Sequence, residues 1–156
     1  MDRTRYTVIR HSNIYGPHDK FDLEHSHVLG ATLTKVMKNA DGQVVMWGPG
    51  TEIRDLLYID DLADFVSKAI QRQQTNFELV NVGSGKGVTI NELVQKIIAC
   101  CGKQLQVSHD LSKPHLPVNI RLDISQAEKI FGWKPTTELQ DGIQKTMAWY
   151  RENISW

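Results

Sequence analysis

The chain has 156 residues, 40% of them apolar, and its 18 Lys and Arg side chains balance 18 Asp and Glu side chains. This length is enough for a substantial core, so residues 1–156 are expected to form a single compact unit. The interspersed charges give no reason to expect a nucleic acid or an anionic membrane as partner, and no apolar run is long enough to cross a bilayer.

The sequence contains two cysteines, Cys100 and Cys101, which are adjacent. They make neither a disulfide framework nor a metal-ligand pattern. The first residues also lack the apolar core of a signal peptide. We therefore expect a cytoplasmic protein.

The first expected strand covers residues 6–10 and leads to a turn at Gly16-Pro17. Ligands of open α/β sheets lie beyond the carboxyl ends of the strands, so Ser12, Asn13 and Tyr15 are candidates for ligand contact. The alternative is structural, with Asn13 forming the turn and Tyr15 capping the core. A helix that would cover this strand does not precede it in the sequence.

Four histidines fall close together in the sequence: His11, His18, His25 and His27. Their spacing lacks the cysteine or carboxylate partners of closed zinc sites, so no metal site is predicted. Two interpretations stay open, namely surface or capping histidines, and a single histidine that acts as acid or base. A helix with an apolar stripe is expected over residues 26–39.

The central stretch, residues 44–70, predicts a strand, a Gly-Pro-Gly turn, a second extended run and a helix begun by Asp60 or Asp61. The apolar face of that helix is expected to comprise Leu62, Phe65, Val66, Ala69 and Ile70. Trp47 and Arg54 lie at the rim of the turn, where a flat ring and a cationic fork could serve a planar base and a phosphate. The alternative is a half-buried tryptophan and a solvated arginine.

The rest of the chain continues the alternation of strands and helices. A strand is expected over residues 76–82 and a helix over residues 89–101, which begins with the capping box Thr89 to Glu92. Residues 112–119 read as a loop, and capping boxes at Ser125 and Thr137 predict two more helices. This alternation indicates the α/β class.

These residues include five motifs that resemble, in order, the C-terminal half of the extended short-chain dehydrogenase/reductases that modify nucleotide sugars. The motifs are N-x-Y-G-P at Asn13–Pro17, W-G-x-G at Trp47–Gly50, R-D-L-L-Y-I-D-D-L at Arg54–Leu62, N-V-G-S-G at Asn81–Gly85, and L-D-I-S with F-G-W-K-P ending at Pro135. The resemblance covers nearly the whole chain.

The resemblance implies a fold made of the last Rossmann strands and a small α/β substrate-binding domain, without the N-terminal cofactor-binding half. Residues 5–17, 54–72 and 76–85 would belong to the Rossmann part, and residues 18–53 and 86–156 mainly to the substrate-binding part.

Within this family, residues 16–21 and the Ser-His-Val element at residues 26–28 are most similar to the GDP-L-fucose synthases. The resemblance implies that His27 is the acid/base of epimerisation beside a keto group, a role that suits an imidazole. It also implies that Trp47 and Arg54 contact the nucleotide. Lys35, eight positions after His27, would address the diphosphate, which needs fixed cationic donors.

Further contacts follow from the same resemblance. Ser12 and Asn13 would line the edge of the NAD(P) pocket, Asn13 would also contact substrate, and Arg121 is the candidate for a basic substrate contact in the loop before Leu122. The family's G-x-x-G-x-x-G turn and the Y-x-x-x-K motif of hydride transfer do not occur in the sequence. NAD(P) is therefore expected in full-length members and not in this chain alone.

The leading hypothesis is a portion of an NAD(P)-dependent epimerase/reductase that binds a nucleotide sugar, favoured as a GDP-4-keto-6-deoxyhexose, and is inactive alone. One alternative is a freestanding nucleotide-sugar binding module, or a half-enzyme completed by a partner chain that supplies the N-terminal half. Another is a structural remnant that forms a homodimer through an exposed sheet edge.

Overall fold

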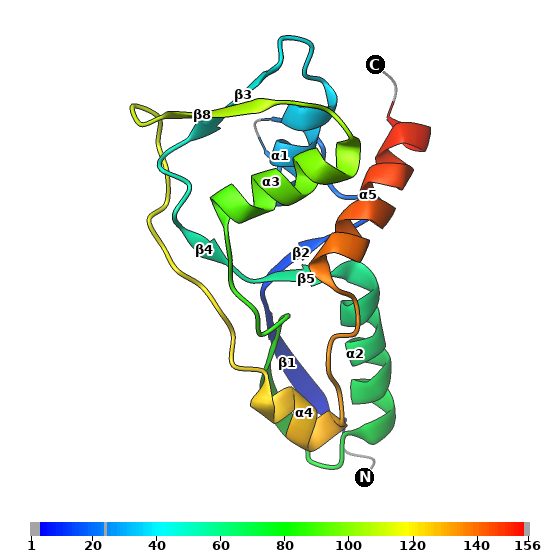
Figure 1. The fold of residues 1–156 in the computed structure, drawn as a ribbon. Coiled ribbons are helices and arrows are strands. Elements are labelled where there is room, and N and C mark those ends of the chain that lie inside the picture. Colours follow the sequence, from blue (N-terminus) through cyan, green and yellow to red (C-terminus); the bar gives the residue numbers. More distant parts are fainter. Residues whose placement is uncertain (1–3, 24, 155–156) are drawn as a thin grey trace.

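A computed structural model describes residues 4–23 and 25–154, which form an elongated molecule with two lobes (Figure 1). The first lobe comprises β1 (Tyr6–His11), β6 (Phe77–Val82), α2 (Ile59–Arg72) and α4 (Ser125–Phe131). The second comprises α1 (Val28–Met37), β3 (Gln43–Trp47), α3 (Ile90–Cys101), β8 (Gln106–Asp110) and α5 (Leu139–Asn153). Short strands join the lobes: β2 (Asn13–Tyr15), β4 (Ile53–Arg54), β5 (Leu56–Tyr58) and β7 (Val88–Thr89).

The strands pair across long stretches of sequence. β1 pairs with β6, β2 with β5, and β3 with β8, all in parallel, whereas β4 and β7 are antiparallel. Parallel neighbours require crossover connections, and helices supply most of them here. The predicted α/β class is confirmed, and no helix in the described ranges is long and apolar enough to span a membrane.

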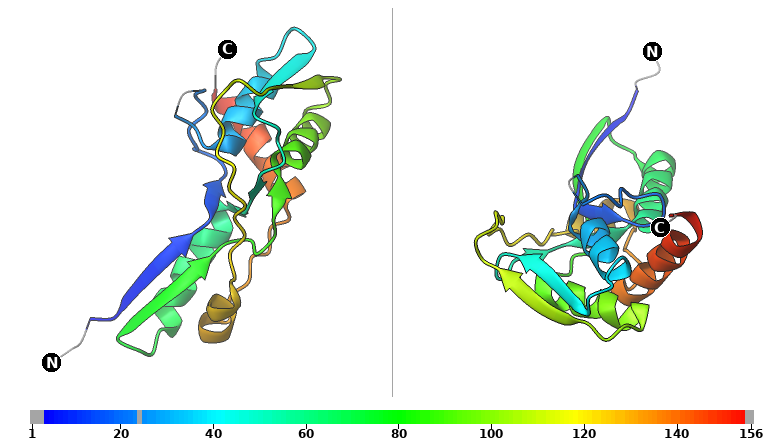
Figure 2. Two further views of the ribbon diagram at one scale, coloured as in Figure 1. Left: turned by 90° about the vertical axis from the view of Figure 1, so that its left-hand side faces the viewer. Right: turned by 90° about the horizontal axis from the view of Figure 1, so that it is seen from above.

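Each lobe has its own apolar core. In the second lobe, α1, α3 and α5 pack their buried faces together, and Leu33, Ile97 and Ile143 are fully buried between them. In the first lobe, Phe65 of α2 and Trp133 pack with the inner face of β6. Figure 2 shows the two groups of helices at opposite ends of the molecule.

One face of the β1–β6 sheet is uncovered. Tyr6 pairs in register with Phe77, and Val8 with Leu79, and all four side chains are exposed, Tyr6 to 62%. The helices α2 and α4 pack on the other face (Figure 2). Parallel sheets are normally covered on both faces, so this apolar face has the character of an interior surface.

The helix starts differ from three expectations. α2 begins at Ile59, and the carboxylate of Asp61 accepts hydrogen bonds from the distant amides of Thr136 and Thr137 instead of capping its own helix. α5 begins at Leu139, with Glu138 and not Thr137 at the N-cap position and without a side-chain cap. α4 likewise has no side-chain cap; the amide of Ser125 bonds to Asp123.

Other local predictions have mixed outcomes. The capping box of Thr89 and Glu92 is confirmed, with both reciprocal bonds present. The predicted apolar face of α2 is only partly correct, because Phe65 and Ala69 are buried whereas Val66 and Ile70 are exposed, Ile70 to 80%.

Candidate functional site

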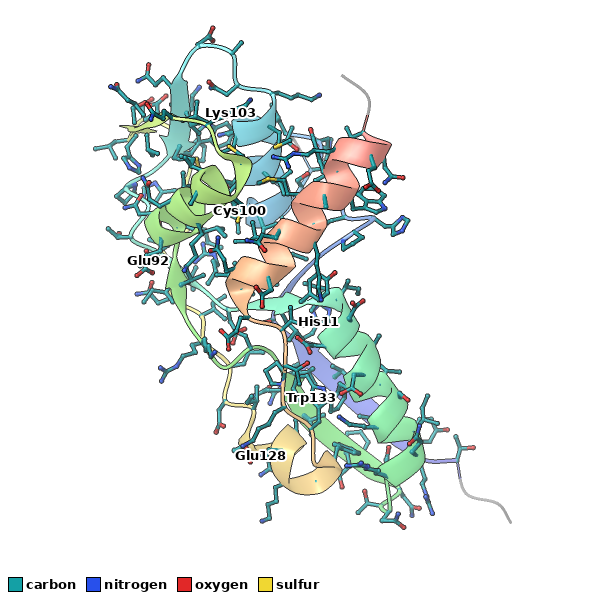
Figure 3. The ribbon with its side chains drawn as sticks, turned by 45° about the vertical axis from the view of Figure 1, so that its right-hand side comes forward. His11, Glu92, Cys100, Lys103, Glu128 and Trp133 are labelled. Carbon is teal, nitrogen blue, oxygen red and sulfur yellow. The ribbon has the colours of Figure 1, made fainter. Side chains whose placement is uncertain are left out.

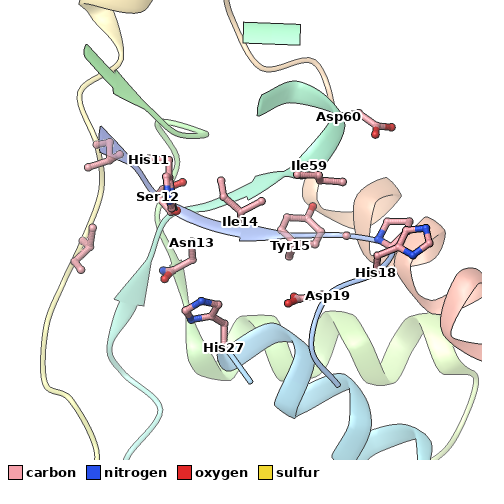
Figure 4. A pocket seen from close by; sticks show the side chains of 14 residues that line it. His11, Ser12, Asn13, Ile14, Tyr15, His18, Asp19, His27, Ile59 and Asp60 are labelled. Carbon is pink, nitrogen blue, oxygen red and sulfur yellow. Dashed lines mark hydrogen bonds between the residues drawn. The ribbon is translucent and has the colours of Figure 1, made fainter. Parts of the chain in front are cut away.

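A cavity of about 860 Å³ opens beyond the carboxyl end of β1, and we call it the strand-end cavity. Its lining includes Ser12 and Asn13 from the β1–β2 junction, and Asp19 and His27 from the segment that leads into α1. Figure 4 shows these side chains around one hollow. The position agrees with the rule that ligands of open α/β sheets lie beyond the strand ends.

Ser12 carries a hydroxyl that has no hydrogen-bond partner among the described residues, although its side chain is buried. The backbone carbonyl of Ser12 lies 2.8 Å from Nδ1 of His11, and the amide of Asn13 donates to the carbonyl oxygen of Asp55. A buried hydroxyl that is unpaired loses solvation without compensation. It is therefore available to donate to, or accept from, a ligand in the strand-end cavity.

Asp19 and His27 bring an acid and a base to the same wall. One oxygen of Asp19 accepts from the amide of Lys20 at 2.7 Å, and the other is buried without a partner among the described residues. Burial raises the pKa of Asp19, while the Lys20 amide and the neighbouring His27 lower it. His27 is exposed and is the residue before α1, so the helix start places its backbone at the edge of this cavity.

The raised pKa of Asp19 predicts a pH-dependent gain in stability for Asp19→Asn. The folded protein holds the Asp19 proton more tightly than the unfolded chain, so wild type loses stability as the pH rises from the ordinary value of 3.8 through the folded pKa. Asparagine does not ionise, so the variant should unfold at a higher temperature at about pH 7 and show less advantage at about pH 3.

A matched control has the opposite sign. Hydrogen bonds from Ser112 lower the pKa of Asp110, so Asp110→Asn should lose stability relative to wild type above pH 3.8 and converge with it in acid. A pH-independent difference between wild type and Asp19→Asn would contradict the prediction.

A second cavity, of about 260 Å³, lies beside the carboxyl end of β3, and we call it the Trp47 cavity. It brings together Lys35, Trp47 and Arg54. The Lys35 ammonium lies 5.3 Å from the centroid of the Trp47 ring, within cation–π range, and donates to the carbonyl of Val45. Burial lowers the pKa of Lys35.

Arg54 is held in place by the loop that covers the Trp47 cavity. Its guanidinium donates to the carbonyl oxygens of Leu116 at 2.9 Å, Ile53 at 3.0 Å, and Val118. The guanidinium is therefore fixed next to the Trp47 cavity. It holds the covering loop through these bonds and contributes a positive charge to the cavity lining.

The two cavities are lined by neighbouring residues of the same segments. His27 lines the strand-end cavity, while its neighbours Ser26 and Val28 line the Trp47 cavity. One loop covers both, through residues 114–116 over the Trp47 cavity and Ile120 over the strand-end cavity. An elongated ligand could therefore occupy both.

The structure thus gathers most of the candidate residues into these cavities. Ser12, Asn13 and His27 line the first, and Lys35, Trp47 and Arg54 line the second. Arg121 is exposed and is absent from both linings.

Three acidic residues near the site were not singled out from the sequence. Asp19 and Glu52 line the cavities, and Asp55 is completely buried beside them. No local pattern marks them, because acidic residues in extended segments are usually solvated.

No group of three or more His, Cys, Asp or Glu side chains that could hold a metal ion occurs within the described residues. Of the four neighbouring histidines, His25 pairs with an acidic residue: its Nδ1 lies 3.3 Å from Oδ1 of Asp22.

Comparison with known proteins adds an independent observation. Residues 1–83 match the model of the NAD dependent epimerase/dehydratase family. The chain is 40% identical over 147 residues to the probable GDP-L-fucose synthase 1 of Oryza sativa subsp. japonica, and 33% identical over 160 residues to the GDP-L-fucose synthase of Escherichia coli K12. These alignments cover 92% and 95% of this chain but 44% and 49% of the relatives, so the chain spans about half their length.

Solved structures agree on the fold. The UDP-glucose 4-epimerase of Thermotoga maritima, solved with UDP-glucose, superposes with a TM-score of 0.84 at 25% identity, over 97% of this chain and 47% of that one. MoeE5, solved with UDP-glucose and NAD, has a TM-score of 0.80 at 20% identity, over 97% of this chain and 48% of that one. With the family model matched over more than half of the sequence, the chain belongs to the NAD-dependent epimerase/dehydratase family.

Proposed function

We infer that this chain is the substrate-binding portion of a nucleotide-sugar epimerase/reductase. The observation that supports this most directly is the pair of cavities that the same chain segment and the same loop border, one containing His27 and the other containing Trp47, Lys35 and Arg54. A nucleotide sugar has the same two-part character, with a planar base and diphosphate at one end and a reactive sugar at the other.

Each side chain has a chemical task in this proposal. Trp47, 51% exposed, offers a ring face to the base, and Lys35 and Arg54 place positive charge for the diphosphate. His27 exchanges a proton at the sugar carbon next to a keto group, which an imidazole can do near neutral pH. The similarity to GDP-L-fucose synthases favours a GDP-4-keto-6-deoxyhexose as the substrate class.

The nicotinamide cofactor of the family would meet this chain only at the edge of the strand-end cavity. The unpaired hydroxyl of Ser12 and the amide of Asn13 fit a polar group such as a carboxamide. When bound, NAD(P) supplies hydride transfer. Since the sequence contains neither G-x-x-G-x-x-G nor Y-x-x-x-K, we propose that the chain alone binds substrate without turning it over.

Titration calorimetry with GDP-, UDP- and dTDP-sugars tests the proposal through Arg54→Ala. The variant should bind its preferred nucleotide sugar more weakly by about 1.5–3 kcal/mol, the usual range for a hydrogen bond to a charged group. Arg151→Ala, which removes an exposed arginine of α5, is the matched control and should bind as wild type does.

Two results would count against the proposal. Equal affinities of wild type and Arg54→Ala would remove Arg54 from the site. The absence of binding heat from wild type with every nucleotide sugar would contradict the function itself.

The exposed sheet face supports a second candidate, a half-enzyme completed by another polypeptide. The apolar side chains of Tyr6, Val8, Phe77 and Leu79 form an uncovered surface on a parallel sheet, and one edge of β1 has no neighbouring strand among the described residues. Parallel sheets are normally covered on both faces, and an unpaired strand edge can pair with another chain, so both features favour association with a second polypeptide. A chain that sediments as a monomer at high concentration would argue against self-pairing and leave a different polypeptide as the occupant.

A further inference from the structure

A buried carboxylate lines the Trp47 cavity. The Glu52 side chain is 6% exposed, and its Oε1 has no hydrogen-bond partner among the described residues. The imidazole of His115 lies nearby, with its Nε2 3.9 Å from Oε1, which is beyond hydrogen-bonding distance. The backbone carbonyl of Glu52 is already used, since it accepts from the amide of Ile90.

The other charged groups of the cavity do not satisfy Glu52. The guanidinium of Arg54 donates to backbone carbonyls of its own segment and of the covering loop, and the ammonium of Lys35 donates to the carbonyl of Val45. A buried carboxylate oxygen without a hydrogen-bond donor is costly, because it loses its hydration and His115, at 3.9 Å, replaces it only through charge when the imidazole is protonated. A ligand that brings N–H groups to this wall would remove that cost.

The loop residue His115 is held close to the turn after β3. Gly48 has φ +72°, and a Cβ at this position would lie 2.6 Å from the Cβ of His115. His115 therefore packs directly on this turn and within 3.9 Å of Oε1 of Glu52. The cavity thus has a ring face, a loop wall and one acceptor-only group.

We propose that the Glu52 carboxylate reads the Watson–Crick edge of the nucleobase and selects guanine, a role that rests on the proposed nucleotide-sugar function. Guanine presents two adjacent donors, N1–H and N2–H₂, which match the two oxygens of a carboxylate. Uracil and thymine flank a single N3–H with carbonyl oxygens that the carboxylate repels. Adenine and cytosine each place a ring-nitrogen acceptor beside their amino group, so one oxygen would remain unpaired.

The test is calorimetry with GDP, IDP and UDP on wild type and Glu52→Gln. IDP keeps N1–H but lacks the 2-amino group, so wild type should bind GDP best, IDP less well and UDP weakest. Glu52→Gln should weaken GDP binding by about tenfold, the discrimination expected of one bidentate contact to a base edge, and should strengthen UDP binding, because the neutral amide no longer repels the uracil carbonyls. Glu128→Gln is the matched control, because Glu128 is an exposed residue of α4 in the other lobe (Figure 3) and pairs with Lys134.

The outcomes separate the inference from the function on which it rests. Wild type that binds GDP, IDP and UDP equally would overturn the role of Glu52 and leave the nucleotide site standing. Wild type that binds none of them would overturn both. Retained GDP preference in a folded Glu52→Gln protein, verified by thermal unfolding, would also overturn the role, and the ligand series on wild type remains decisive if the variant does not fold.

Discussion

Replacing Asp55 with alanine is expected to lower the free energy of unfolding by about 3 kcal/mol, since each buried donor left unpaired costs about 1–3 kcal/mol. Asp55 is completely buried, and its carboxylate accepts from the amides of Ser84, Gly85 and Leu122 and from the hydroxyl of Ser84, at 2.7–3.1 Å. Removing it leaves several buried donors without an acceptor. Urea denaturation measures the loss.

The same substitution should also weaken ligand binding. The hydrogen bond from the Leu122 amide to Asp55 ties the end of the covering loop to the segment that carries Arg54. The carboxylate is tightly enclosed, since a Cβ at Gly83 would lie 2.9 Å from it. Asp123→Ala is the matched control: Asp123 is exposed and its carboxylate accepts from the amide of Ser125 at the start of α4, so this variant should change stability much less. Equal urea midpoints for Asp55→Ala and wild type would contradict the proposed role of this carboxylate.

Trp133→Ala is expected to cost about 3–5 kcal/mol of folding free energy, as for other fully buried large side chains. Trp133 is 0% exposed and packs edge-on against Phe65, with ring centroids 5.3 Å apart. Its indole N–H donates to the carbonyl of Asp61 at 3.1 Å. Figure 3 places Trp133 between α2 and α4, so the substitution opens a hole in the core of the first lobe.

Trp47→Ala provides the reciprocal comparison. Trp47 is 51% exposed and lines a cavity, so its removal should change unfolding by roughly 0.5 kcal/mol or less while it weakens nucleotide binding. Denaturation and calorimetry on both variants therefore separate a core tryptophan from a binding tryptophan. A large stability loss in Trp47→Ala together with unchanged nucleotide affinity would assign Trp47 to the fold and not to the site.

The sequence by itself determined the features that depend on neighbouring residues. The strand at residues 77–82 follows from its run of apolar and β-forming residues, and the start of α3 from the reciprocal bonds of Thr89 and Glu92. The five motifs indicated the family, and the place of Trp47 and Arg54 at the rim of a Gly-Pro-Gly turn already made them candidate ligand contacts.

Only the tertiary structure decided the roles of the acidic residues and the shape of the site. Asp61 looked like a helix cap, and instead its carboxylate is bound by amides more than seventy positions away. The helical periodicity predicted that Ile70 is a core residue. It is exposed instead, because α4 and Trp133 pack against Phe65 and Ala69 on another part of α2. Whether a polar group is buried and paired depends on donors from distant segments, which local periodicity does not encode. Glu52 is visible as a candidate for the same reason, because its burial and its unpaired oxygen exist only once the covering loop is in place.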